Sequence, residues 1–291
     1  MKNKILFITY ISILFSVSVN AQLFWKVTGN ELTKPSYIFG THHLIEKEKI
    51  AGFDKVLAII PQTDVVVGEM DLSNILSMQL KMMKEVIMKD TTISDLLSKE
   101  NYMLVDSQFK NVLGKGLDKF AKMKPIFLST LFEIKLYMNQ NNLKKEPEAV
   151  DIVFQKEGKK QKKEIIGLET VDQQINILFN SLSLKKQAEI LVLAVKDKDN
   201  SALKIKQLNE AYLKGDLKML SHFFNSDVEM TSEYKKIMIE YRNNNWISQL
   251  KLLMPKQSCF VAIGCMHLVD ERGLIHQLKN AGYTVEAVEG Y

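Results

Sequence analysis

Short apolar runs recur along this chain between much longer stretches that have a helical pattern. Most of these runs are rich in β-branched or aromatic residues and are bounded by glycine, proline or polar residues, which is typical of buried strands. The first two runs are joined by a polar turn at Gly29-Asn30 and are expected to form a hairpin. The predicted strands cover residues 23–27, 36–39, 64–70, 164–169, 259–263 and 283–288.

The segments between these runs carry apolar residues at helical spacing and contain few glycines or prolines. Residues 45–60 form the first of them. Residues 72–143 are rich in Met and Leu, and Pro125 is expected to begin one of the helices there. Residues 170–250 are also helical, and a short helix is predicted over residues 273–281.

No linker or low-complexity segment divides the chain, so the pattern predicts a single α/β domain with a mixed central sheet. The helices of residues 72–143 are a large insertion between the strand that ends at Glu69 and the strand that ends at Glu169. The strongly charged stretch 144–164 ends in a lysine cluster. We interpret that cluster as a solvated helix end and turn rather than as a nucleic-acid or membrane patch.

The chain opens with two lysines, followed by an apolar run from Ile5 to Val19 and the small residue Ala21. This order is typical of a secretory signal peptide, and the run is shorter than the roughly 20 residues that a membrane-spanning helix needs. We therefore expect residues 1–21 to be removed and the mature domain, residues 22–291, to be exported to the periplasm or outside the cell. No membrane span is expected in the mature chain.

The formal charge falls from +5 to +3 when residues 1–21 are removed, because they contain two lysines and no acid. A charge this small gives no support to a nucleic-acid partner. Cys259 and Cys265 lie along one predicted strand segment, about 20 Å apart if extended. A disulfide requires Cα atoms within about 7 Å, so both are expected to be small, buried apolar residues.

Two segments of the form G-x-x-H-L follow predicted strands near opposite ends of the chain, at residues 40–44 and 264–268. A glycine at the end of a strand lets the chain turn sharply and leaves the histidine at the carboxyl edge of the sheet. His43 and His267 hold equivalent places, so we expect them to converge on one site. His42 is an alternative to His43, but only His43 has the spacing of the second segment.

Two acids, Glu69 and Glu169, also follow strands, and in open α/β sheets ligands bind beyond the carboxyl ends of strands. Each residue taken alone suits a turn or helix-cap role. The occurrence of a histidine or a glutamate after four different strands favours a shared site. Imidazole with carboxylate suits a divalent transition metal such as Mn, Co, Zn or Fe, which would activate water and polarise a carbonyl. Without a metal, a His–Glu pair is able to activate water directly.

The ordered set of motifs resembles the TraB/GumN family, which includes the Tiki metalloproteases, and is similar more distantly to ChaN and the erythromycin esterases. The likeness runs over nearly the whole mature chain. It rests on G-T-x-H and an acid after the early strands, L-E-T-x-x-x-Q, a G-D pair, an R-N pair, and a closing G-x-x-H-L, G-L and G-Y-x-V. These motifs are residues 40–43, 65–69, 168–174, 215–216, 242–243, 264–268, 273–274 and 282–285.

The resemblance implies a ChaN/erythromycin-esterase-like fold and a metal-dependent hydrolase, a peptidase that acts on a peptide or protein substrate with Mn, Co or Zn. His43, Glu69 and His267 are implied as metal ligands or catalytic groups, and Glu169 as a ligand or base. Arg242 is implied as a group that stabilises an anionic intermediate or pins a carboxylate. Asp151 and Asn243 are implied as supporting residues.

Two other kinds of function stay open. A non-catalytic envelope protein would bind a peptide or a haem-like ligand in the same cleft. An interaction protein would instead use its Met-rich helices as a pliable contact surface, with Met78, Met82 and Met83 at the centre of that surface. The sequence predicts no particular oligomeric state.

Overall fold

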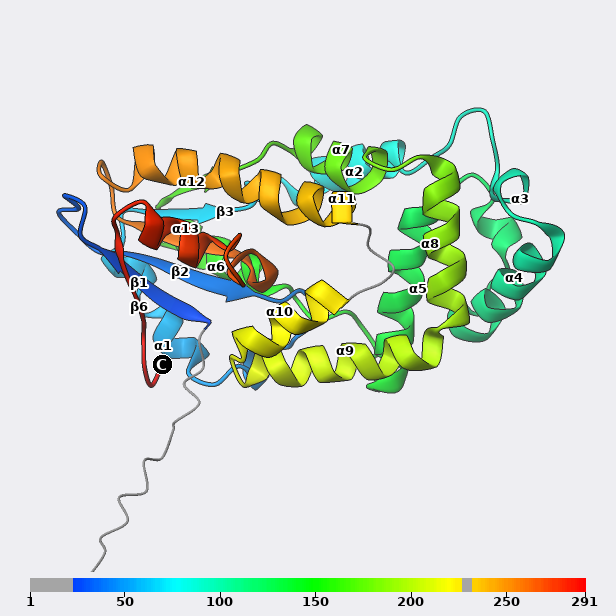
Figure 1. Cartoon of the computed structure of the whole chain (residues 1–291), viewed down its shortest axis with the longest axis horizontal. Coiled ribbons are helices and arrows are strands. Elements are labelled where there is room, and N and C mark those ends of the chain that lie inside the picture. The colour runs from blue at the N-terminus through cyan, green and yellow to red at the C-terminus, as the bar shows by residue number, and fades with distance from the viewer. Residues whose placement is uncertain (1–22, 227–231) are drawn as a thin grey trace, which may run out of the picture.

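The computed structural model describes residues 23–226 and 232–291, so the predicted signal peptide lies outside the described residues. Its core is a six-stranded sheet with the strand order β4-β3-β5-β2-β1-β6 (Figure 1). All six predicted strands are present. Their bounds are β1 (Phe24–Thr28), β2 (Ser36–Thr41), β3 (Val65–Gly68), β4 (Glu164–Gly167), β5 (Cys259–Gly264) and β6 (Thr284–Ala287).

The sheet is mixed, as predicted. Strands β4, β3, β5 and β2 are parallel neighbours, whereas β1 is antiparallel to both β2 and β6. The first two strands form the predicted hairpin. Parallel neighbours end at the same edge, so the segments that follow β4, β3, β5 and β2 meet there. Along that edge the four expected strand-end residues come in the order Glu169, Glu69, His267 and His43.

Helices cover both faces of the sheet and make a three-layer structure. Val65 and Val67 of β3 pack with α12 (Tyr241–Leu253) and α13 (Leu274–Asn280) on one face. Val66 packs with α1 (Phe53–Leu57) and α6 (Val150–Lys160) on the other face. Successive strand side chains point to opposite faces, and both faces are covered, which explains the uninterrupted apolar runs of β3 and β5.

The predicted helical insertion lies between β3 and β4, and Pro125 begins α5 as expected. Helices α3, α4, α5 and α8 share a core of their own and extend beyond one end of the sheet (Figure 1). The bounds in this half are α2 (Ile75–Glu85), α3 (Ile93–Leu96), α4 (Lys99–Leu113), α5 (Pro125–Gln140), α7 (Val171–Asn180), α8 (Leu184–Lys196), α9 (Lys198–Leu213), α10 (Leu217–Ser226) and α11 (Ser232–Lys235).

Residues 45–60 differ from the single helix that the pattern predicts. Two 3₁₀ turns flank the short helix α1, and Gly52 immediately before it has a φ of +68°, which no α-helix accommodates in its interior. The charged stretch 144–164 contains α6, whose side chains Val150 and Phe154 are fully buried. Only the lysine-rich end of α6 is the predicted solvated helix end.

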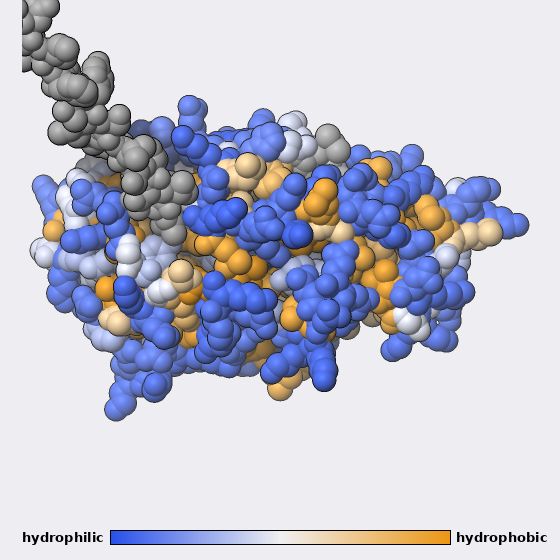
Figure 2. Space-filling view, turned by 90° about the horizontal axis from the view of Figure 1, so that it is seen from below, coloured by the Kyte–Doolittle hydropathy of each residue, from blue (hydrophilic) through white to orange (hydrophobic). Residues whose placement is uncertain are grey.

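The surface is mixed in character. Figure 2 shows apolar patches between hydrophilic side chains on the face seen from below. Within residues 23–226 and 232–291, no helix is long and apolar enough to cross a membrane. Cys259 and Cys265 are free and buried, as expected.

Candidate functional site

The two G-x-x-H-L segments lie against each other at the ends of neighbouring parallel strands. Thr41 of β2 pairs with Gly264 of β5. A Cβ on Gly40 would lie 2.8 Å from Cδ1 of Leu268 and 3.1 Å from Cβ of Cys265, both in the second segment. Gly40 has no positive φ, so it is needed for this close approach rather than for the predicted sharp turn.

Arg242 of α12 lies at the centre of three of the expected strand-end residues. Its Nε donates to Oε1 of Glu169 at 2.7 Å, and its Nη2 donates to Oε2 of Glu69 at 2.6 Å and to Oε2 of Glu169 at 3.0 Å. Its Nη1 donates to the carbonyl oxygen of Met238 at 3.2 Å and lies 3.1 Å from Nε2 of His267. Together these contacts use all five N–H groups of the guanidinium.

We call Arg242, Glu69, Glu169 and His267 the Arg242 cluster. His267 is neutral and buried within it, since burial lowers its pKa to about 3. Both amide hydrogens of Asn243 go to carbonyl oxygens, those of His267 and Arg272. Oδ1 of Asn243 must therefore accept from Nδ1 of His267, at 2.7 Å, which assigns the ring proton to Nδ1. Nε2 is then the acceptor that faces Arg242.

The two carboxylates of the cluster are held by other donors as well. Oε1 of Glu69 accepts from the backbone N–H of Gly264 at 2.9 Å, and its Oε2 accepts from Gln174 at 3.1 Å. Oε1 of Glu169 accepts from the indole N–H of Trp246 at 3.0 Å. Burial acts to raise the pKa of Glu69, but the positive charge of Arg242 and the hydrogen bond from the backbone N–H of Gly264 hold that pKa below its ordinary value. Glu69 is therefore ionised at neutral pH.

His43 is the accessible member of the expected set, with 69% of its side chain exposed. Its Nδ1 lies 3.1 Å from Oδ2 of Asp151, whose Oδ1 accepts from Oγ1 of Thr41 at 2.5 Å. The close contact with the Asp151 carboxylate raises the pKa of His43 to about 9, and the charge of Glu69 also raises it. His43 is consequently an imidazolium at neutral pH, within electrostatic reach of the Arg242 cluster.

His42 has different surroundings. Its Nδ1 accepts from the backbone N–H of Leu44 at 3.2 Å, and its ring lies 5.1 Å from that of Tyr212. Burial lowers the pKa of His42 to about 4. The imidazole with a carboxylate partner and high exposure is thus that of His43, the residue with the repeated spacing.

The residues expected to bind a divalent metal do not fit one in this arrangement. Oε2 of Glu69 and Nε2 of His267, which would otherwise be available to a metal, face the guanidinium of Arg242. His43 pairs with Asp151 instead. In the part of the chain that the structure describes, no group of three or more His, Cys, Asp or Glu residues is placed to hold a metal ion. A cation at this point would have to displace Arg242.

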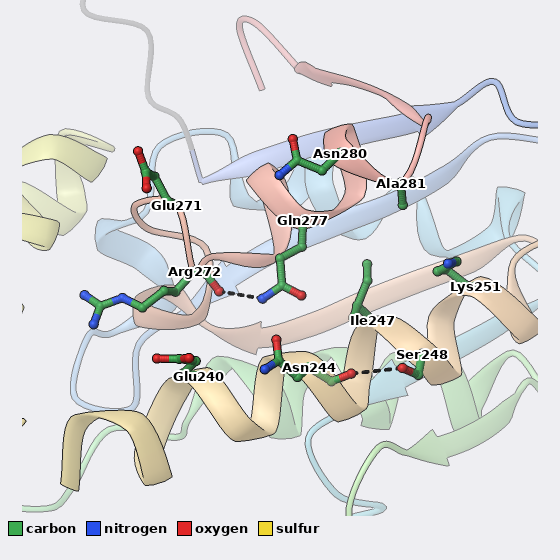
Figure 3. A pocket seen from close by; sticks show the side chains of 10 residues that line it. All are labelled: Glu240, Asn244, Ile247, Ser248, Lys251, Glu271, Arg272, Gln277, Asn280 and Ala281. Atoms are coloured by element: carbon green, nitrogen blue, oxygen red, sulfur yellow. Dashed lines mark hydrogen bonds between the residues drawn. The ribbon is translucent and has the colours of Figure 1, made fainter. Parts of the chain in front are cut away.

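Two cavities lie outside these residues. A shallow one of about 500 Å³ opens between α12 and α13 and is lined by polar side chains such as Asn244 and Gln277 (Figure 3). It lies on the face of α12 opposite to Arg242, and none of the expected site residues lines it. The second cavity, of about 580 Å³, lies beside the segment that follows His43.

Sequence reasoning did not single out Trp246 or Gln174, which complete the Arg242 cluster. Trp246 is four residues after Arg242, so helical spacing alone places the two side chains on one face of α12. The ring of Trp246 lies 4.7 Å from the guanidinium carbon and 4.3 Å from the ring of His267. Gln174 belongs to the L-E-T-x-x-x-Q segment, where its role had no separate signal.

Comparison with protein-family models matches residues 23–287 to the TraB/PrgY/gumN family. No curated protein and no solved structure matches the chain. The matched region contains all six strands, the Arg242 cluster and the His43–Asp151 pair.

Proposed function

Because the chain belongs to the TraB/PrgY/gumN family, we propose that it is an exported hydrolase that cleaves a peptide bond at the carboxyl edge of its sheet. The observation that carries this proposal is the His43–Asp151 pair. An exposed imidazole, held at one nitrogen by a carboxylate that is 11% exposed, is the arrangement that proton transfer to a substrate requires.

His43 is the catalytic acid in this proposal. Asp151 binds Nδ1, so Nε2 is the ring nitrogen that meets the substrate. The imidazolium delivers its proton to the leaving amide nitrogen as water adds to the carbonyl carbon and the carbon–nitrogen bond breaks. The proton that the water loses as the carboxyl group forms returns to His43 and restores the imidazolium. Asp151 is a positioning residue, itself held by Thr41.

Glu69 orients the attacking water. It is ionised, and its side chain is 18% exposed, against 6% for Arg242 and 7% for Glu169. Arg242 then acts as a positioning residue that fixes the Glu69 carboxylate. Because its five N–H groups are engaged, the contacts favour the carboxylate-pinning role of Arg242 over stabilisation of an anionic intermediate. No step is assigned to a metal ion.

The pH profile of peptide cleavage tests the role of His43. We expect the rate to be flat from about pH 5 to pH 8 and to fall as the pH rises through about 9, where His43 loses its proton. Asp151→Asn should move this alkaline limb to lower pH, because the contact that raises the pKa is weakened. His43→Ala should lower kcat by about 10²–10⁴-fold, and the exposed His276→Ala is the matched control. Quenched fluorescent peptides give the rates.

Two results would count against this assignment. A rate that rises between pH 6 and pH 9 would make His43 a general base rather than an acid. Peptide binding without any cleavage, measured with the same peptides, would support the alternative of a non-catalytic envelope protein that uses this cleft.

A further inference from the structure

The cavity of about 580 Å³ is lined by the segment after His43 and by the helices α5 and α9. Ile45 and Lys49 form one wall, Tyr137 belongs to α5, and the remaining wall comes mainly from α9. The hydroxyl of Tyr137 donates to the carbonyl oxygen of Leu44 at 3.1 Å, directly beside His43. The cavity is therefore tied to the G-x-x-H-L segment, and its volume is typical of small-ligand sites.

Helix α9 lines this cavity with apolar, amide and charged side chains. Ala202, Lys206, Asn209 and Leu213 recur at intervals of four, three and four residues, which is one stripe of a helix. Leu203 beside them is 54% exposed. The wall thus offers an apolar surface, an amide and a lysine, and the carboxylate of Glu210 also lies on the cavity lining.

The side chain of Asn209 gives a second indication, besides the cavity itself, that a ligand binds here. The residue is only 8% exposed, and among the described residues its Oδ1 has no hydrogen-bond partner. A buried acceptor of this kind is costly unless something donates to it. Since Asn209 lies on the cavity wall, an N–H group of a bound molecule is a suitable donor.

A lysine on the cavity wall supplies a positive charge for a ligand. Lys49 already pairs with Glu46 at 2.5 Å, so Lys206, one helical turn before Asn209, is the cation that we assign to a ligand. A backbone N–H, an apolar side chain and a carboxylate occur together, at this spacing, in the carboxyl-terminal residue of a peptide.

We propose that this cavity binds the free carboxyl terminus of the peptide substrate. The terminal amide N–H donates to Oδ1 of Asn209, the terminal side chain packs on Leu203 and Leu213, and the carboxylate pairs with Lys206. The cavity then selects peptides by their free end, while His43 acts on a bond further along. This assignment rests on the proposed peptide hydrolase.

The test measures binding separately from cleavage. Fluorescein-labelled pentapeptides ending in leucine, with either a free carboxylate or a carboxamide, are titrated with the His43→Ala protein and followed by fluorescence anisotropy. We expect the free acid to bind at least tenfold more tightly than the amide. Lys206→Met should abolish that preference, and Asn209→Leu should weaken both peptides about fivefold. Lys251→Met, in the cavity between α12 and α13, is the matched control and should change neither affinity.

Equal binding of the acid and the amide, or an unchanged preference in Lys206→Met, would overturn the cavity assignment. Asn209→Leu with unchanged affinity and a raised melting temperature would also overturn it, because Asn209 would then be a structural defect only. Cleavage by the unsubstituted protein is measured in parallel. Binding with the acid preference but no cleavage removes the hydrolase proposal and leaves the cavity assignment standing, whereas cleavage without the preference does the reverse.

Discussion

At the scale of single residues, Arg242 carries the electrostatics of the site. It neutralises two carboxylates, and removing it would leave both of them buried without a counter-charge. We expect Arg242→Met to lower the free energy of unfolding by about 3–5 kcal/mol, as breaking a buried ion pair typically does. Urea denaturation gives the value. Lys251→Met, on the outer side of the same helix, should stay within about 0.5 kcal/mol of the unsubstituted protein.

The same variant tests the metal dependence that the family resemblance implies. Without the guanidinium, Glu69, Glu169 and His267 become two carboxylates and an imidazole around one point, a donor set suited to Co or Zn. Arg242→Met should therefore bind one Co²⁺, visible in its absorption spectrum, where the unsubstituted protein binds none. Equal Co²⁺ binding by both proteins would show that Arg242 moves aside for the ion.

His267 makes the stability of the fold depend on pH. Its pKa is lowered by burial to about 3 in the fold, against about 6.5 in an unfolded chain. The unfolded chain therefore takes up a proton first, and stability present above pH 6.5 is lost as the pH falls toward 3. The loss is at most about 1.4 kcal/mol per pH unit for this one group. His267→Gln should remove that part of the slope in urea titrations between pH 6 and pH 4, and identical slopes would contradict it.

At the scale of elements, β3 and α6 pack closely where Gln155 of α6 lies against Gly68 of β3. A Cβ on Gly68 would lie 2.4 Å from Nε2 of Gln155, which donates to the carbonyl oxygen of Met70, while Oε1 of Gln155 accepts from Leu72. The glycine thus leaves room for the amide that holds the chain directly after Glu69.

Gly68→Ala should consequently cost about 1–3 kcal/mol, because Gln155 must move and give up hydrogen bonds. In the background of Gln155→Ala, the same substitution should cost much less. Thermal or urea unfolding of the two single variants and the double variant gives the coupling between the positions. Additive effects would show that the crowding at Gly68 is relieved in some other way.

The elements were the most predictable level of this protein. The run Val65-Val66-Val67 predicted β3 and Pro125 predicted the start of α5, because burial and proline geometry act locally. The break of the helix at Gly52 was not predicted, since apolar spacing continues through it. The five contacts of Arg242 were also beyond the sequence, because they depend on how α12 crosses the strand ends. Convergence of the two G-x-x-H-L segments was predicted. Asp151 was expected only as a supporting residue, and its pairing with His43 was not predicted.

At the scale of the whole molecule, the predicted export has the clearest test. Expressed in a secreting host, the full chain should yield a protein that begins at Gln22, with residues 1–21 removed. Ala21→Arg should block this processing, because signal cleavage needs a small residue at that place. Intact-mass measurement distinguishes the two forms, and Gln22→Asn is the matched control. A mature protein that retains residues 1–21 would contradict the signal-peptide prediction.

The position of β5 in the sheet also fixes when the candidate site is assembled. During synthesis, β2 pairs with β1 and β3 pairs with β4, but the two pairs are joined into one sheet only when β5, more than 190 residues after β3, inserts between β3 and β2. Until then both strands have an unpaired edge, and contacts this distant in sequence form slowly. Glu69 and His43 acquire their shared edge only when β5 has inserted. A chain that stops before residue 259 lacks both β5 and His267, so it is expected to be prone to aggregate and to lack the assembled site. The candidate site is therefore among the last parts of the molecule to form during synthesis.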